Sequence, residues 1–131
     1  AGSYEPHRPT IDACFRFDRA EEIVSALRSD GSEWALKQAD TIDSKSPETV
    51  KVALRQVREG GACETFEDNM RMEYRIGWRT EQSADFIEGV RAVIIDKDHA
   101  PKWSPDTLEA VSDQNGARYF EPLGDDELSF E

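Results

Sequence analysis

The sequence predicts an all-α protein of about six helices with little or no sheet. Apolar residues recur along the chain at spacings of three and four, and Ser-Pro starts and glycine stops bracket several of these segments. No stretch alternates apolar and polar residues as a strand does, and no Asn-Gly turn separates strand-like segments. With 37% hydrophobic and 34% charged residues, the 131-residue chain predicts a thin core and much solvated helix. Its length fits one domain or a piece of a larger one.

Two short helices are expected first, joined as a hairpin. The segment AEEIVSALRSDG carries Ile23 and Leu27 at helical spacing and ends at Gly31, which can adopt a left-handed conformation. The segment SEWALKQADTID places Ala35 and Ala39 on one face. Because the joint between the two segments is short, the helices should lie antiparallel.

The clearest helix is predicted over SPETVKVALRQVREGG. Ser46 can cap the free amide hydrogens, Pro47 suits the first helical position, and Gly60 or Gly61 can end the helix. Its expected buried stripe is Val50, Leu54 and Val57. A further helix follows, with an apolar stripe at strict i+4 spacing formed by Phe66, Met70, Tyr74 and Trp78.

The last third of the chain is expected to begin with a helix near Ser83. This helix should turn Phe86 and Val90 inward, and extended chain should then run to Pro101. A second Ser-Pro helix start is predicted at Ser104. The final eleven residues contain five acids and no base.

Composition excludes or disfavours several functions. The net charge of −12 opposes nonspecific binding to nucleic acid, and no apolar run approaches the ~20 residues that span a bilayer. Two separated cysteines, Cys14 and Cys63, with no ligand spacing around His7 or His99, favour idle thiols over a disulfide and predict no metal site. Residues 1–10 lack a signal or transit pattern and are expected to be a disordered or vector-derived lead, with one helical domain over 11–131.

Charged clusters allow two interpretations. Arg71, Arg75 and Arg79 stack on one helical face, where they could meet phosphate or a carboxylate cluster; alternatively, neighbours such as Glu67 neutralise a solvated face. The nearby acids, Glu64 to Glu73, are expected to be structural, since nothing local drives their pKa values apart. Neither a G-x-S-x-G motif nor a Gly-rich loop before a helix is present, so no catalytic residue is assigned.

Several segments, in order and spacing, resemble the C-terminal region of the 3-hydroxyisobutyryl-CoA hydrolase family, a branch of the crotonase (enoyl-CoA hydratase/isomerase) superfamily. They are SPETVKVALRQVREG, MEYRIGWR, ADFIEGVRAVIIDKDHAPKWSP, YFEPLG and DELSF. The resemblance implies hydrolysis of a short acyl-CoA thioester in valine catabolism, with an oxyanion hole and catalytic acids on a crotonase core. This chain has no HxGxxxGG-like oxyanion segment, so by itself it is expected to be inactive. The stretch WRTEQSADF departs from the family's usual residues there.

The resemblance also implies a substrate-binding role for two residues. On the family analogy, Arg91 and Lys97 would contact a phosphate of CoA; alternatively, Arg91 pairs with Glu88 or Asp85 and Lys97 is only exposed. No separate cofactor is expected, since CoA is part of the substrate.

The expected partners are the acyl-CoA substrate, the crotonase core and another copy of the chain, without a membrane. The location would be mitochondrial in a eukaryote and cytoplasmic in a bacterium. A non-catalytic homologue in the small subunit of the mitochondrial ribosome, where nucleic acid could lie nearby, or a protein-interaction domain is the alternative.

Overall fold

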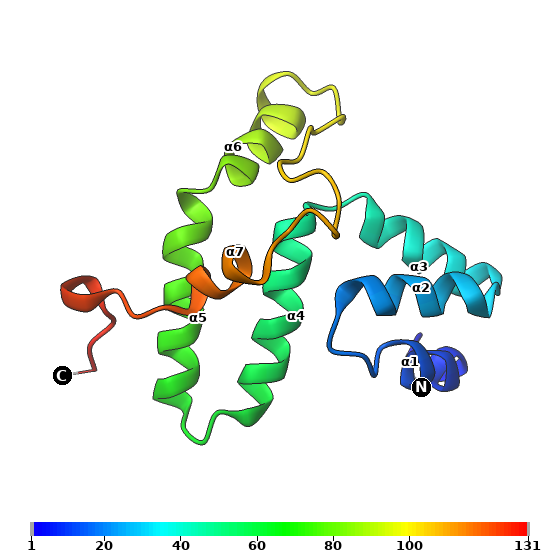
Figure 1. Cartoon of the computed structure of the whole chain (residues 1–131), viewed down its shortest axis with the longest axis horizontal. Coiled ribbons are helices and arrows are strands. Elements are labelled where there is room, and N and C mark those ends of the chain that lie inside the picture. The colour runs from blue at the N-terminus through cyan, green and yellow to red at the C-terminus, as the bar shows by residue number, and fades with distance from the viewer. Residues whose placement is uncertain (1, 131) are drawn as a thin grey trace. The chain divides into compact units, whose positions relative to one another are not determined.

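The computed structural model describes residues 2–130, and this part of the chain is helical, with no strand (Figure 1). The predicted all-α class is therefore confirmed. Seven α-helices lie within the described residues: α1 (Arg8–Cys14), α2 (Ala20–Asp30), α3 (Glu33–Asp43), α4 (Pro47–Ala62), α5 (Phe66–Glu81), α6 (Ala84–Val90) and α7 (Asp113–Ala117). Shorter turns are η1 (Glu5–His7), the π-helix η2 (Arg91–Ile95), η3 (Arg118–Phe120) and η4 (Gly124–Asp126).

The chain divides into two compact units, up to Lys45 and from Ser46 onward. In the first unit, α2 packs against both α1 and α3. Leu27 is completely buried on α2 and Ala35 and Ala39 are completely buried on α3, which confirms the predicted hairpin faces. Gly31 has a φ of 74° and ends α2, as the sequence predicts.

Residues 5–14, which include part of the expected disordered lead, are helical in this structure. The His7 and Trp34 rings stack with centroids 4.6 Å apart, and Cys14 is buried. The start of the chain therefore has its own packing within the first unit. The division after Lys45 is not predicted from the sequence.

The second unit is built on the α4 and α5 hairpin, with α7 and η3 packed against it (Figure 1). Its buried cluster consists of Val52, Met72, Ile76 and Tyr119, with Phe120 beside it. Near this cluster the buried carboxylate of Glu48 accepts a hydrogen bond from Arg118 Nη2 at 2.7 Å. Since an unpaired buried carboxylate is costly, this pair fixes α7 and η3 against the start of α4.

Helix starts follow the local signals closely. Ser46 caps α4 by accepting a bond from the Thr49 amide, and Thr65 and Ser83 cap α5 and α6 in the same way. The predicted stop at Gly60 or Gly61 is wrong, because α4 continues to Ala62. A β-carbon at Gly60 would lie 3.1 Å from Asn69 Oδ1, so this glycine serves the close approach of α5.

Two predicted buried stripes are wrong. Val57 is 71% exposed, and α4 instead buries Val52; on α5, Met72 and Ile76 are buried, whereas Phe66 and Trp78 are exposed. Periodicity identified amphipathic helices correctly but did not identify which apolar face meets the core of this unit. The second apolar face of α5 is therefore available to another surface.

The predicted helix at Ser104 is absent. Residues 104–112 form turns, with Leu108 and Val111 buried, and α7 starts only after its cap at Ser112. The Ser104 amide donates to the Asp85 side chain at 2.9 Å. A distant carboxylate therefore binds a group that the local sequence would place at a helix start.

The arginine column on α5, formed by Arg71, Arg75 and Arg79, binds the C-terminal segment of the chain. Arg79 donates to the carbonyls of Glu121 at 2.6 Å and Tyr119 at 3.3 Å, and Arg75 pairs with Glu127 at 2.9 Å. Arg71 lies over the Phe130 ring. Although burial opposes ionisation, the Leu123 amide and Arg75 lower the pKa of Glu127 below its ordinary value. The column therefore binds this chain's own carbonyls and the carboxylates of Asp68 and Glu127.

The buried Leu27 side chain gives a stability test. Leu27→Ala should lower the free energy of unfolding by about 2–5 kcal/mol, because the site is fully enclosed and leaves a cavity. Leu36→Ala, at a position 38% exposed, serves as control and should cost under about 1 kcal/mol. Urea denaturation measures both changes, and equal effects would contradict the assignment of the first unit's core.

Candidate functional site

The candidate site is the segment from Asp85 to Ser104, which combines α6, η2 and the loop that follows. The side chain of Ser83 accepts a bond from the Phe86 amide and so starts α6. The chain then widens into a π-turn, in which the Asp96 amide donates to the Arg91 carbonyl at 2.8 Å. The His99 amide donates to the Ala92 carbonyl at 3.0 Å, which folds the loop back onto η2.

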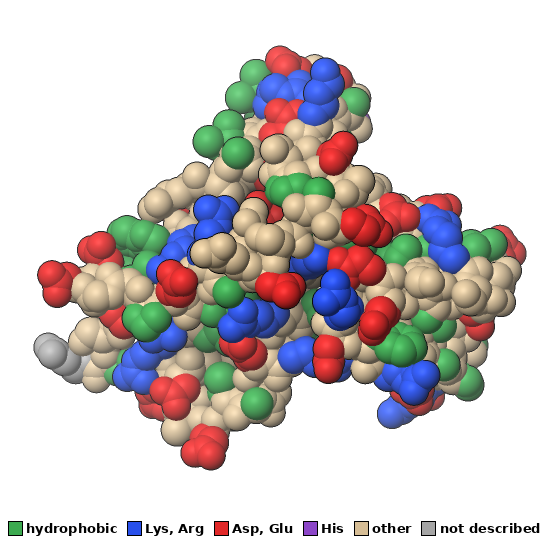
Figure 2. Space-filling view, viewed as in Figure 1, with side chains coloured by type: hydrophobic (Ala, Val, Ile, Leu, Met, Phe, Trp, Pro, Cys, Tyr) green, Lys and Arg blue, Asp and Glu red, His purple; other side chains and the backbone are tan. Residues whose placement is uncertain are grey.

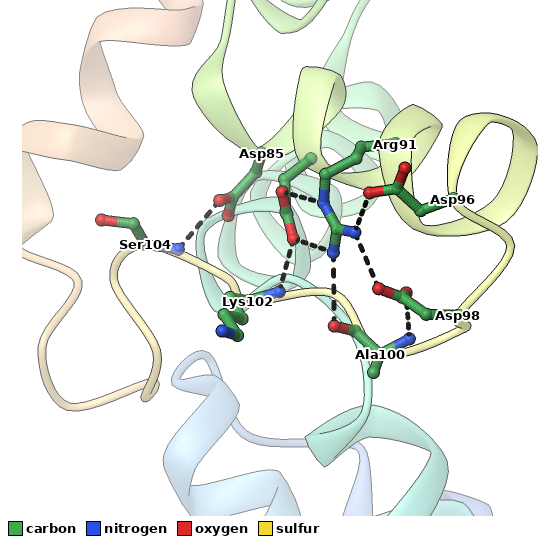
Figure 3. Close-up of polar contacts among 8 residues, drawn as sticks. Asp85, Arg91, Asp96, Asp98, Ala100, Lys102 and Ser104 are labelled. Atoms are coloured by element: carbon green, nitrogen blue, oxygen red, sulfur yellow. Dashed lines mark hydrogen bonds and ion pairs between the residues drawn. The ribbon is translucent and has the colours of Figure 1, made fainter.

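Arg91 is the centre of this segment, and its guanidinium contacts three carboxylates (Figure 3). Its Nε and Nη2 atoms bind the two oxygens of Glu88 at 2.9 and 2.6 Å. Its Nη1 atom binds Asp96 at 2.8 Å and Asp98 at 2.7 Å. A guanidinium forks onto planar acceptors in this way, so one side chain ties α6 to both ends of the turn.

The acids of α6 also bind the backbone of the returning loop. Glu88 Oε1 accepts from the Lys102 amide at 2.9 Å, and buried Asp85 accepts from the Ser104 amide and from the Ser46 hydroxyl. Figure 3 shows the Asp85 carboxylate facing the loop segment that carries the Ser104 amide. Helix α6 therefore fixes the loop through one acid per turn.

These contacts shift the titration of the acids. The hydrogen bond from Arg91, followed by that from the Lys102 amide, lowers the pKa of Glu88 from 4.5 to about 2. The same guanidinium and the Ala100 amide lower the pKa of Asp98. The hydrogen bonds of Glu88, Asp98 and Asp96 raise the pKa of Arg91 in return.

One predicted orientation on α6 needs correction. Phe86 was expected to face inward but is 47% exposed, whereas Asp85 is buried. The reason is polar: Asp85 must reach two donors on other segments, and this turns the adjacent phenylalanine outward. Apolar periodicity gave no sign of this, although an acid in the first turn of a Ser-capped helix is itself a usable signal.

The predicted residues Arg91 and Lys97 lie in the same segment but in different environments. Arg91 pairs with Glu88, which is one of the two alternatives that the sequence left open. Lys97 is exposed, has a φ of 54°, and makes no hydrogen bond or ion pair with any residue between 2 and 130. The CoA phosphate contact stays a prediction for Lys97, while the geometry of Arg91 favours a role inside the loop.

The groove between α4 and α5 beside Tyr119 contains no catalytic constellation. The groove between α4 and α5, of about 220 Å³, is lined by Thr49, Val52, Ile76 and Tyr119 among others, without an acid and base pair. No group of three His, Cys, Asp or Glu side chains in residues 2–130 could hold a metal ion, and no described helix is long and apolar enough to cross a membrane. Cys14 and Cys63 are free thiols.

Comparison with known proteins agrees with the pattern in this segment. Residues 1–120 match the profile of the enoyl-CoA hydratase/isomerase family. The chain belongs to this family. It is 42% identical over 127 residues to the mitochondrial 3-hydroxyisobutyryl-CoA hydrolase of Mus musculus, and 41% identical over 126 residues to that of Homo sapiens. The resemblance to the 3-hydroxyisobutyryl-CoA hydrolase family is thus confirmed.

Two solved structures are similar to this chain over nearly its whole length. A carnitinyl-CoA dehydratase from Mycobacterium thermoresistibile is 36% identical with a TM-score of 0.92, covering 100% of this chain and 37% of that one. An enoyl-CoA hydratase from Rhodobacter sphaeroides is 30% identical with a TM-score of 0.90, covering 99% and 38%. The matches to the mouse and human hydrolases cover 97% and 96% of this chain. They cover 33% and 32% of the hydrolases, so the chain spans about a third of the length of these relatives.

The shifted pKa of Glu88 gives a direct test of the network. Because its pKa is lowered, its contribution to stability is present above its ordinary value of 4.5 and is lost as the pH falls toward about 2. The amide resonance of Lys102, which donates to Glu88, should therefore titrate with a midpoint near pH 2 in ¹⁵N spectra.

Arg91→Met is the control for this titration. Without the guanidinium, the midpoint seen at Lys102 should move up toward the ordinary value for glutamate. An unsubstituted chain that already titrates at that ordinary value would show that the Arg91 and Glu88 pair does not form in solution.

Proposed function

We propose that this chain is the C-terminal helical part of a mitochondrial 3-hydroxyisobutyryl-CoA hydrolase, which converts 3-hydroxyisobutyryl-CoA and water to 3-hydroxyisobutyrate and CoA in valine catabolism. The observation that carries the proposal is the 42% identity to the mouse hydrolase, maintained over 97% of this chain. In this proposal the catalytic groups belong to a crotonase core outside the chain, and the 131 residues complete and support that core. In a bacterium the location would be cytoplasmic.

Lys97 supplies the proposed contact with the substrate. Its ammonium is exposed and has no partner among residues 2–130, so it can offer a point charge to a CoA phosphate. Contact with the nucleotide end of CoA would not touch the thioester. Lys97 would therefore contribute to substrate affinity and not to the chemical step.

An apolar surface on α6 and η2 supports the presence of a covering core. This surface, called here the outer apolar patch, consists of residues that are 47–69% exposed: Phe86, Ile87, Val93, Ile94 and Ile95. Figure 2 shows hydrophobic side chains on the projection formed by α6 and η2, beside its charged cluster. Contiguous exposed apolar surface of this kind marks an interaction site. The outer apolar patch is thus the proposed contact with the core.

Activity measurements test the proposal. The 131-residue chain should release no CoA from 3-hydroxyisobutyryl-CoA above a buffer blank, as followed with a thiol reagent, because no acid and base pair or oxyanion hole is assigned to it. The same chain joined to its core should release CoA with turnover. Hydrolysis by the chain alone would contradict the proposed location of the active site.

Inactivity of the joined protein would have a different meaning. It would contradict the enzymatic proposal and favour the non-catalytic alternative, a ribosomal or protein-interaction role. Co-purification with small ribosomal subunits would then be the next measurement, since that alternative predicts stable association.

Substitution in the outer apolar patch tests the proposed covering. Ile94→Asp should lower the melting temperature of the joined protein by several degrees, because a charge would be buried against the core. In the 131-residue chain the same change should leave the melting temperature nearly constant and reduce any self-association seen by light scattering. Val57→Asp, at another exposed apolar position, is the matched control. Equal tolerance of both changes in the joined protein would show that the core does not cover the patch.

A further inference from the structure

The turn between Asp96 and Ala100 has a backbone conformation that residues of these types rarely adopt. Lys97 and His99 have φ values of 54° and 52°, in the left-handed region that residues with a β-carbon rarely adopt. Neither residue is a glycine or an asparagine, so the conformation must be imposed by contacts elsewhere. The contacts closest to this turn are made with Arg91 or with the π-turn that contains it.

Arg91 holds both ends of this turn. Its Nη1 atom binds Asp96 and Asp98, the two neighbours of Lys97, at 2.8 and 2.7 Å. Asp98 in turn accepts from the Ala100 amide at 2.9 Å, and Arg91 Nη2 lies 3.5 Å from the Ala100 carbonyl. Without this guanidinium, the turn would keep its two backbone bonds to Arg91 and Ala92 and the bond from the Ala100 amide to Asp98, and Asp96 and Asp98 would no longer be tied to α6.

Charge gives Arg91 a second effect on Lys97. The two carboxylates adjacent to Lys97 in sequence are bound by Arg91, and Figure 3 shows both directed toward its guanidinium. If that guanidinium were removed, Asp96 and Asp98 would lose their cationic partner, and Lys97 would be the cation closest to them in sequence. An ammonium bound by two carboxylates is a poor partner for a phosphate.

We infer that Arg91 is a positioning residue for anion binding by Lys97. It keeps the Asp96–Ala100 turn in its left-handed conformation and occupies the two flanking aspartates, so that the Lys97 ammonium stays available to a phosphate of the CoA nucleotide. This inference rests on the proposed function. It also replaces direct phosphate binding by Arg91, because the guanidinium donors already have carboxylate and carbonyl acceptors.

The test compares two substrates in the chain joined to its core. One is 3-hydroxyisobutyryl-CoA, and the other is the pantetheine thioester of the same acyl group, which lacks every phosphate. Arg91→Met should raise KM for the CoA thioester about tenfold or more, the effect of losing a contact between charged groups. KM for the pantetheine thioester and kcat for both substrates should change less than about twofold.

Further variants separate positioning from general structural damage. Lys97→Ala should raise KM for the CoA thioester by a similar factor, and the double variant should be no worse than about twofold beyond either single one, because both act on one contact. Arg91→Lys keeps the charge but not the fork, and should fall between the parent and Arg91→Met. Arg55→Met, at an exposed arginine paired with Glu59 on α4, is the control and should change neither KM.

Hydrogen exchange on the 131-residue chain tests the turn without any activity. Arg91→Met should increase exchange at the Ala100 and Lys102 amides, whose acceptors Asp98 and Glu88 it holds, whereas Lys97→Ala should leave both protected. Unchanged protection in Arg91→Met would overturn the positioning role.

Kinetic outcomes can overturn the inference separately. An equal rise in KM for both thioesters would make Arg91 a structural residue only, and an unaffected KM in Lys97→Ala would remove the anion contact. An inactive joined protein would contradict the proposed function, and the exchange experiment would still decide whether Arg91 fixes the turn.

Discussion

Arginine side chains connect the segments of this protein where its apolar residues are too few to do so. In the first unit Arg28 bridges α2 to Asp40 and Asp43 of α3, at 2.9 and 2.6 Å. In the second unit Arg118 joins η3 to the buried Glu48, and Arg91 joins α6 to the loop behind it. Each guanidinium presents several donors in a plane, so a single side chain can bind two segments at once.

The contribution of these ion pairs to the stability of the fold depends on their burial. Arg28 pairs with acids whose side chains are well exposed, and because water and salt screen such a surface pair, it contributes little to stability. Glu48 is buried, and loss of Arg118 would leave an unpaired carboxylate away from water, a change that is strongly destabilising. Asp85, also buried, accepts two hydrogen bonds from neutral groups instead. The same acidic composition thus serves solubility on the surface and connection inside.

Local signals in the sequence predicted local structure well. Ser46 and Ser83 cap their helices, and Gly31 stops α2 in a left-handed conformation, because each needs only contacts within one turn. Gly60 and Ser104 have equally clear local signals, yet both predictions are wrong. Their roles depend on Asn69 and Asp85, which are distant in sequence, and no local pattern reports such partners.

The errors over apolar faces have a different cause. The chain spans about a third of the relatives that it matches, and several amphipathic stripes leave large apolar residues exposed in this structure, among them Phe66, Trp78 and Ile95. Periodicity reports that a face is apolar but does not distinguish contact within the chain from contact with another surface. The candidate site was predicted only in part. The sequence indicated the segment and the alternative in which Arg91 pairs with Glu88. It did not indicate that Arg91 also pairs with Asp96 and Asp98 across the turn.

The contacts of the Asp85 to Ser104 segment bear on what similarity to the hydrolases means. Asp85 accepts from an amide and a hydroxyl, Glu88 accepts from an amide and pairs with Arg91, and none of these bonds requires a thioester. A homologue without catalysis would need them equally to form the same loop, so their presence indicates the fold of this region. Lys97 differs, because its ammonium makes no hydrogen bond or ion pair with any described residue. A requirement for that ammonium would arise from binding an anion, which makes Lys97 the position where an active enzyme and a purely structural relative should diverge.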